Sequence, residues 1–269
     1  DLNKIKNILD EFEYMQGLRL LITGGEPCMH SGFNEINEML SGYSFRKILF
    51  TNGLLLKDDL IKRLNVDEIQ FSIDGMEKGH EILRGKGTYK IVMEKLIKSI
   101  DFGITVSIAT MVHRGNLDEF EAMENLFKKL GIKEWTVDVP CEVGNLKKDQ
   151  SLMVSPEIGG KYLNFGFGTG LHSSEGGYGC GLNLVSVLAN GNISKCAFYS
   201  DMPVGSIDEG LIKTWKKINP IKLEDLECNK INCRFIDLCR GGCRYRAEQS
   251  GNKGKKDLYK CHMYGIIKL

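Results

Sequence analysis

The 269-residue sequence lacks the features that mark membrane-spanning and nucleic-acid-binding proteins. It has no apolar run near the roughly 20 residues of a membrane-spanning helix, which excludes a helical integral membrane protein. It also lacks an excess of one charge, since 36 Lys and Arg balance 35 Asp and Glu. That balance excludes a uniformly basic nucleic-acid binder. No signal-like segment opens the sequence, so we expect a cytoplasmic protein with neither a membrane nor a nucleic-acid partner.

Cysteine is scarce over most of the chain and dense at its end. Only Cys28 and Cys141 occur in the first 179 residues. Because no secretion signal is present, the late cysteines favour metal ligation over a disulfide scaffold. Seven thiolates exceed the four of one zinc site and are one short of two four-cysteine iron–sulfur clusters. Zinc and disulfides remain alternatives. The seven are Cys180, Cys196, Cys228, Cys233, Cys239, Cys243 and Cys261.

The first half alternates strand and helix patterns, which predicts an α/β fold with parallel strands and outer helices. Such units form either an open sheet or a TIM-like barrel. The predicted strands are Leu18–Ile22, Lys47–Thr51, Glu68–Ile73, Ile104–Thr110 and Trp135–Val139. The predicted helices are Asn3–Met15, Phe33–Leu40, Asp58–Leu64, Thr88–Phe102 and Leu117–Leu130.

The periodic pattern weakens after residue 140. The glycine-rich stretch Phe165–Gly179 is typical of a loop. A hairpin is expected from Leu184–Leu188 and Ile193–Cys196, with Asn190-Gly191 in its turn, and a short helix at Asp208–Ile218. We therefore expect a barrel-like domain at 1–140, a connecting segment at 141–175 and a cysteine-rich domain at 176–269.

Polar residues follow several predicted strands. Thr23-Gly24-Gly25-Glu26-Pro27 comes directly after the first strand, where α/β folds bind ligands. The glycines allow close approach of a ligand, and the Glu26 carboxylate suits an ammonium group. The alternative is a tight turn with a capping glutamate.

The other strand ends carry Thr51-Asn52-Gly53, Ser72-Ile73-Asp74-Gly75 and His113-Arg114-Gly115-Asn116. Ser72 and Asp74 alternate along the chain and so point to one side of their strand, where a hydroxyl and a carboxylate can bind a ribose. Each segment alone is more often a turn, but together they predict a ligand at this edge of the sheet.

The cysteines have specific spacings. Cys180 and Cys196 bracket the predicted hairpin as C-x10-G-x4-C, and Cys228 begins a C-x4-C-x5-C-x3-C run. Residues 228–269 hold ten Lys and Arg against three Asp and Glu. Basic residues are favourable beside anionic thiolate clusters. A solvated basic tail is the alternative.

These motifs resemble the radical SAM enzymes. Leu20–Pro27 is similar to the family's S-adenosylmethionine motif, and Cys180–Cys261 resembles its SPASM extension, which binds two auxiliary [4Fe–4S] clusters. The resemblance implies a partial (β/α)6 TIM-like barrel with a C-terminal cysteine-rich iron–sulfur (SPASM) domain. The central x4 spacing, where the family usually has x2, enlarges a loop.

The resemblance also implies roles for individual residues. Gly24, Gly25 and Glu26 would hold the amino group of S-adenosylmethionine, while Ser72 and Asp74 would contact its ribose. The implied ligands of the first auxiliary cluster are Cys180, Cys196 and Cys243. The implied ligands of the second are Cys228, Cys233, Cys239 and Cys261. A third, catalytic [4Fe–4S] cluster requires a C-x3-C-x2-C loop that the printed sequence lacks, so we expect its ligands upstream of Asp1.

The implied activity is reductive cleavage of S-adenosylmethionine and modification of a substrate by the resulting radical. A ribosomally made peptide is the leading substrate, with a thioether or other crosslink as product and a flavodoxin or ferredoxin as electron donor. The alternatives are a tetrapyrrole-modifying enzyme and a catalytically silent iron–sulfur scaffold or electron carrier.

The fourth ligand of the first auxiliary cluster is open. Three cysteines leave one iron for water, for His172 or Glu175, or for a substrate thiolate, and we expect this open iron. The alternative is that Cys141 closes the site. By itself, Cys141 is more often a small buried apolar residue, and the same holds for Cys28.

Overall fold

The computed structural model describes residues 1–142, 150–168, 176–249 and 254–266. The chain divides into two compact units. The first, here called the barrel unit, comprises residues 1–138 and 165–170; the second, here called the cysteine-rich unit, comprises residues 139–164 and 171–269. Each is described by itself. In the described residues no helix is both long and apolar enough to cross a bilayer.

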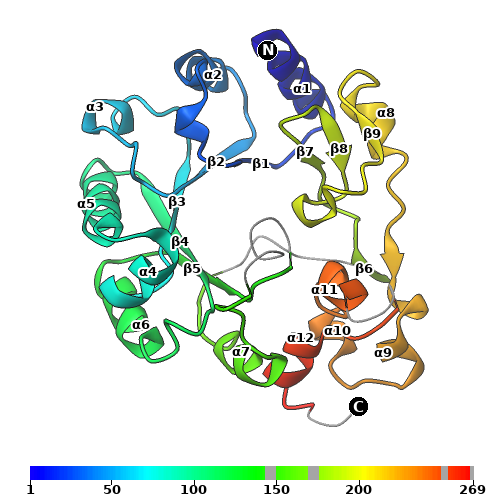
Figure 1. The fold of residues 1–269 in the computed structure, drawn as a ribbon. Coiled ribbons are helices and arrows are strands. Elements are labelled where there is room, and N and C mark those ends of the chain that lie inside the picture. Colours follow the sequence, from blue (N-terminus) through cyan, green and yellow to red (C-terminus); the bar gives the residue numbers. More distant parts are fainter. Residues whose placement is uncertain (143–149, 169–175, 250–253, 267–269) are drawn as a thin grey trace. The chain divides into compact units, whose positions relative to one another are not determined.

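The barrel unit is built on one parallel sheet whose five strands lie in chain order, as Figure 1 shows. Each strand pairs in parallel with the next along the chain. The α/β fold predicted from the alternating pattern is confirmed, because helix lies between each pair of successive strands and returns the chain to the same end of the sheet. The strands are β1 (Arg19–Ile22), β2 (Arg46–Thr51), β3 (Glu68–Ser72), β4 (Thr105–Met111) and β5 (Glu134–Asp138).

Helices flank this sheet (Figure 1). Five agree with the predicted ones: α1 (Leu2–Tyr14), α2 (Phe33–Leu40), α3 (Asp58–Ile61), α5 (Thr88–Asp101) and α6 (Phe120–Lys129). The sequence did not predict α4 (Glu77–Arg84), in which Ile82 and Leu83 are the only large apolar residues. Glu119 fixes its first turn by accepting hydrogen bonds from the backbone N–H groups of Met76 and Gly79, at 2.8 and 3.1 Å.

The two faces of β3 differ in chemistry. Ile69 and Phe71 are fully buried, and the strand packs against α5, whose Val92 and Leu96 are also fully buried. Glu68 and Gln70 alternate with them and so lie on the opposite face, where both contact Ser107 of β4. The sheet therefore has an apolar outer face toward the helices and a polar inner face.

The cysteine-rich unit contains two small antiparallel sheets and several short helices. One sheet pairs β6 (Tyr178–Cys180) with β10 (Ile221–Lys222), and the other has the order β7-β8-β9. The predicted hairpin is present as β7 (Ser186–Val187) and β8 (Asn192–Ser194), with Gly191 at φ +84° in its turn. The remaining elements are β9 (Gly205–Ser206), α8 (Leu211–Trp215), α9 (Glu227–Lys230), α10 (Ile236–Cys239), α11 (Arg244–Gln249) and α12 (Leu258–Met263).

A helix that the sequence did not predict, α7 (Pro156–Tyr162), lies in the expected connecting segment. It contains Gly159 and Gly160, which disfavour helix by propensity. Packing against α12 explains them, because a methyl group added at Gly160 would lie 2.7 Å from the Tyr259 carbonyl oxygen. Within the glycine-rich stretch predicted as a loop, Phe167 exchanges two backbone hydrogen bonds with Trp135 of β5.

Candidate functional sites

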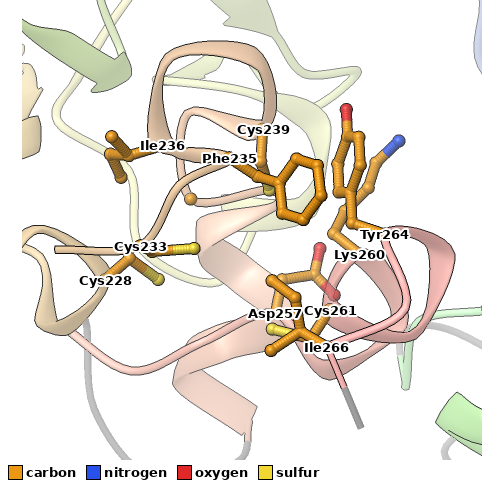
Figure 2. A pocket seen from close by; sticks show the side chains of 11 residues that line it. Cys228, Cys233, Phe235, Ile236, Cys239, Asp257, Lys260, Cys261, Tyr264 and Ile266 are labelled. Atoms are coloured by element: carbon orange, nitrogen blue, oxygen red, sulfur yellow. The ribbon is translucent and has the colours of Figure 1, made fainter. Parts of the chain in front are cut away.

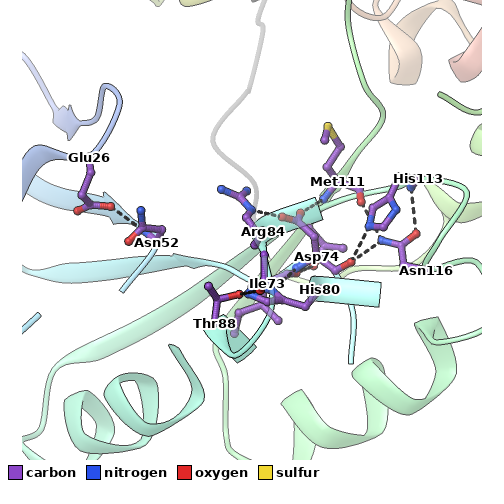
Figure 3. A network of polar contacts seen from close by, with 12 residues as sticks. Glu26, Asn52, Ile73, Asp74, His80, Arg84, Thr88, Met111, His113 and Asn116 are labelled. Atoms are coloured by element: carbon purple, nitrogen blue, oxygen red, sulfur yellow. Dashed lines mark hydrogen bonds and ion pairs between the residues drawn. The ribbon is translucent and has the colours of Figure 1, made fainter. Parts of the chain in front are cut away.

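Glu26 is anchored at the C-terminal edge of the sheet. Its Oε1 accepts a hydrogen bond from the Thr51 hydroxyl at 2.7 Å, and its Oε2 accepts one from the Asn52 N–H at 2.8 Å (Figure 3). Because β1 and β2 are parallel neighbours, their ends bring these residues together. Gly24 and Gly25 open the space beside the carboxylate, since a methyl group at either would meet nothing within 4 Å. The structure thus brings together a fixed anion and an open stretch of backbone.

Cys28 follows this motif in the short turn Pro27–Met29. Burial, and then the charge of the adjacent Glu26 carboxylate, raise the pKa of the Cys28 thiol to about 12. A thiol that is neutral at physiological pH is a poor nucleophile. Cys28 is half-buried, and its interpretation as a small packing residue stays a prediction.

Asp74 is engaged by the protein itself. It is 1% exposed, its Oδ1 accepts a hydrogen bond from the Met111 N–H at 2.7 Å, and its Oδ2 pairs with Nε of Arg84 at 2.5 Å. Ser72 is half-buried and more accessible. The ribose contact expected of Ser72 and Asp74 stays a prediction, but the carboxylate of Asp74 already has two partners.

Arg84 is a site residue that the sequence reasoning missed. It lies in α4, the helix that the periodicity did not predict, and so was not placed near Asp74. Its side chain is 36% exposed, and Figure 3 shows it at the same strand ends as Asp74. The ion pair with Asp74 orients a cation at the edge where Glu26 supplies an anion.

The polar segment after β4 supports the Asp74 loop. His113 accepts a hydrogen bond from the Gly115 N–H at Nδ1, so Nε2 carries the proton and donates to the Asp74 carbonyl oxygen at 3.1 Å. Asn116 donates to the same oxygen at 2.6 Å. On the other side, His80 Nδ1 accepts from the Asp74 N–H at 3.2 Å. Burial lowers the pKa of both histidines, which keeps them neutral.

In the cysteine-rich unit, four of the seven late cysteines line one pocket. Figure 2 shows Cys228, Cys233, Cys239 and Cys261 around it, with Phe235 and Tyr264 stacked beside them. These are the four that the SPASM resemblance assigns to the second auxiliary cluster. Burial raises the pKa of the Cys239 thiol to about 11 and that of Cys261 to about 12, so both are neutral in the metal-free chain.

The arrangement of these donors fits a cluster better than a single ion. All nine cysteines are free thiols. Among the described residues no three His, Cys, Asp or Glu side chains converge closely enough to hold one metal ion, as tetrahedral zinc would require. A [4Fe–4S] cluster binds each thiolate to a different iron, so its four sulfurs surround a cavity instead of a point. A pocket lined by four cysteines matches that donor set.

The other three late cysteines gather with a fourth. Cys196 and Cys243 pack against a buried core that contains Cys141, Tyr199 and Tyr245. Burial raises the pKa of the Cys180 thiol. Cys196 and Cys243 lie close enough to raise it further. The Cys141 thiol donates a hydrogen bond to the Cys243 sulfur, the largest cause of the lowered pKa of Cys243. Two other candidate ligands, His172 and Glu175, lie outside the described residues.

Arg244 serves both cysteine groups. Its side chain is fully buried in α11, and Nη1 donates to the Lys255 carbonyl oxygen at 2.8 Å. Burial raises the pKa of the Cys180 thiol in one group and of the Cys228 thiol in the other. The positive charge of Arg244 acts in the opposite direction on both. A buried guanidinium is therefore placed to offset negative charge at both sites.

The barrel unit thus combines a parallel α/β sheet with an anchored Glu26 at its C-terminal edge. Residues 1–127, which include Glu26 and the first four strands of this sheet, match the model of the radical SAM superfamily.

Comparison with known proteins extends the likeness over most of the chain. The sporulation killing factor maturation protein SkfB of Bacillus subtilis (strain 168) is 25% identical over 246 residues, which are 81% of this chain and 57% of SkfB. An AdoMet-dependent heme synthase of Oleidesulfovibrio alaskensis is 23% identical over 90% of this chain and 74% of that protein. The chain therefore spans little more than half the length of SkfB.

Among solved structures, native anSMEcpe with bound AdoMet and Cp18Cys peptide superimposes with a TM-score of 0.70. The match is 18% identical and covers 98% of this chain and 86% of that one. It confirms the fold across both units: an α/β part with a five-stranded parallel sheet, and a cysteine-rich part with small sheets.

Proposed function

We propose that the protein is a radical S-adenosylmethionine enzyme that modifies a ribosomally made peptide, with two auxiliary [4Fe–4S] clusters in its cysteine-rich unit. The observation that carries the proposal is the gathering of all seven late cysteines into two groups within one unit, in a chain whose barrel unit holds an anchored Glu26. When bound, S-adenosylmethionine and a catalytic cluster supply a carbon radical that abstracts hydrogen from the substrate.

Glu26 and Arg84 offer complementary charges to the methionyl part of the cofactor. The Glu26 carboxylate would accept hydrogen bonds from the ammonium group, while the open backbone at Gly24 and Gly25 leaves room for the cofactor. The Arg84 guanidinium, oriented through Nε by Asp74, would bind the carboxylate. Ser72 would contact the ribose, and Asp74 would act by holding Arg84 in place.

The descriptions of two similar proteins support a peptide substrate. SkfB is a maturation protein for sporulation killing factor, and the anSMEcpe structure holds a bound peptide. Thioether or other crosslink formation would follow hydrogen abstraction, with a flavodoxin or ferredoxin as electron donor. The match to a heme synthase over 90% of the chain favours a tetrapyrrole substrate as the second candidate.

The test uses the complete protein as its gene encodes it, purified anaerobically and reconstituted with iron and sulfide. Incubation with S-adenosylmethionine and a strong reductant should release 5′-deoxyadenosine, measured by chromatography. Glu26→Gln should suppress this release, whereas Glu35→Gln, an exposed glutamate on α2, should not.

The substrate is tested separately with peptides encoded beside the gene and with a porphyrin substrate, and mass spectrometry follows the loss of hydrogen from each. Modification of a peptide supports the proposal, and modification of the porphyrin alone supports the second candidate. Iron–sulfur clusters without any 5′-deoxyadenosine would leave the silent scaffold as the remaining interpretation.

A further inference from the structure

The first auxiliary site has three cysteines assigned to it by sequence, but a fourth lies against them. We propose that Cys141 is the fourth protein ligand of the iron–sulfur cluster held by Cys180, Cys196 and Cys243. The inference rests on the proposed presence of that cluster. It replaces the expected open iron with a site closed by the chain itself.

The contacts of Cys141 distinguish it from an ordinary core residue. It is 5% exposed and packs in the same cluster of side chains as Cys196 and Cys243. Its thiol is in hydrogen-bonding contact with the sulfur of Cys243. The Cys141 sulfur therefore has cysteine neighbours in addition to the aromatic rings that an ordinary packing residue would contact.

The backbone holds Cys141 at this place. Val139, Pro140 and Cys141 are all buried directly after β5, and the proline fixes the local φ angle. Val154, further along the chain, is tied to α12, since the Tyr259 hydroxyl donates to the Val154 carbonyl oxygen at 2.6 Å. Residues 139–164 thus belong to the cysteine-rich unit by their contacts, although they follow the last strand of the barrel unit.

The electrostatic surroundings suit four thiolates. Lys195 lies near Cys180 and Cys196, and Arg246 lies near Cys243. Arg244 adds a third cation that acts on Cys180. A cluster bound by four thiolates has a net negative charge, which three nearby cations stabilise. Phe198 and Tyr245, stacked at 5.8 Å between ring centroids, pack at the same place.

The decisive measurement is the response of the clusters to an added thiol. The complete, reconstituted protein is first saturated with S-adenosylhomocysteine, so that an iron that binds the cofactor is already occupied. The electron paramagnetic resonance of the reduced protein is then recorded with and without 2-mercaptoethanol. We expect no change in the wild-type spectrum and a clear change in Cys141→Ala, where one iron has lost its protein ligand. A wild-type spectrum that responds to the thiol would overturn the assignment.

Iron counting gives a second readout that does not depend on activity. After mild oxidation, Cys141→Ser and Cys141→Ala should lose about one iron per protein, because each cysteine binds one iron of the cluster and the iron without a cysteine leaves first. The control is Cys28→Ser, which changes a half-buried thiol outside the cysteine-rich unit and should keep the wild-type iron content. Unchanged iron and an unchanged thiol response in both Cys141 variants would contradict the proposal.

The outcomes separate this inference from the proposed function. Wild-type protein that binds only the iron of a single cluster would overturn both. The wild-type protein can instead bind the iron of all its clusters while the Cys141 variants match it in iron content and thiol response. That result would overturn only the role of Cys141. A Cys141–Cys243 disulfide in the iron-loaded protein would do the same. Because the wild-type thiol response requires no variant, the test remains decisive even if a substitution prevents folding.

Discussion

The Asp257 carboxylate accepts a hydrogen bond from the backbone N–H of Cys243 at 2.8 Å and also lines the pocket of the other cysteine group. Its side chain is 1% exposed and pairs with Arg246 at 3.0 Å, whose side chain is 8% exposed. One buried ion pair therefore contacts both cysteine groups. Its removal should affect the whole cysteine-rich unit.

Asp257→Asn should destabilise the metal-free protein by about 3 kcal/mol, because it leaves the Arg246 charge buried without its partner. The free energy of unfolding is measured in urea by fluorescence. Asp237→Asn, which changes an exposed carboxylate on α10, is the control and should shift stability by less than about 0.5 kcal/mol. Equal losses in the two variants would contradict the role assigned to the pair.

Glu26→Gln should weaken binding of S-adenosylmethionine by about 1.5–3 kcal/mol, the usual worth of a hydrogen bond to a charged group. The amide keeps the shape of the side chain and can still accept from Asn52, so the barrel unit should remain folded. Isothermal titration calorimetry on cluster-loaded protein measures the affinity. Equal affinities for the variant and the wild type would exclude Glu26 as the partner of the ammonium group.

Cys239→Ser should lower the iron content of the protein, because it removes one of the four thiolates that would bind a cluster in this pocket. The loss should appear in iron and sulfide analysis. It should also weaken the absorbance of the thiolate-to-iron charge-transfer bands. Cys28→Ser again serves as the control. Full iron content in Cys239→Ser would show that this pocket does not hold a cluster.

Stability should fall as the pH drops below the ordinary histidine range. Burial lowers the pKa of His80 and His113 in the folded protein, so the unfolded chain takes up protons near pH 6.5 that the folded chain does not. The free energy of unfolding should decrease toward acid, by at most about 1.4 kcal/mol per pH unit for each histidine.

Urea unfolding at a series of pH values between 7.5 and 5.5 measures this dependence. His113→Gln should flatten the slope. The exposed His30 provides the comparison, and His30→Gln should keep the wild-type slope. A stability that rises toward acid would have the wrong sign for buried neutral histidines.

The fold was largely predictable because its strands and long helices carry regular apolar patterns. The apolar residues in the run Glu68–Ile73 predicted β3 at its observed position. Glu68 and Gln70, in the same run, form the polar inner face of this strand. The helices α4 and α7 were not predicted. Both depend on tertiary contacts, Glu119 for the first and α12 for the second, which local propensity does not contain.

The candidate sites were predictable to the extent that they lie within compact motifs. The Glu26 motif and the spacing of the late cysteines are local in sequence, so the residues could be named in advance. Arg84 lies in an unpredicted helix, and Cys141 is far from its sulfur neighbours in sequence. The sequence reasoning named Cys141 only as the alternative fourth ligand and did not name Arg84, because neither residue lies in a motif with its neighbours in the fold.

The order of the strands has a consequence for how the protein is made. In the barrel unit each strand pairs with the one synthesised just before it, so the sheet can grow strand by strand as the chain leaves the ribosome. The cysteine-rich unit has the opposite character. Its core joins Cys141 to Cys243, and its four-cysteine pocket is closed by Cys261 near the last described helix. A cluster in this pocket could therefore be inserted only after Cys261 has been synthesised, later than the whole parallel sheet.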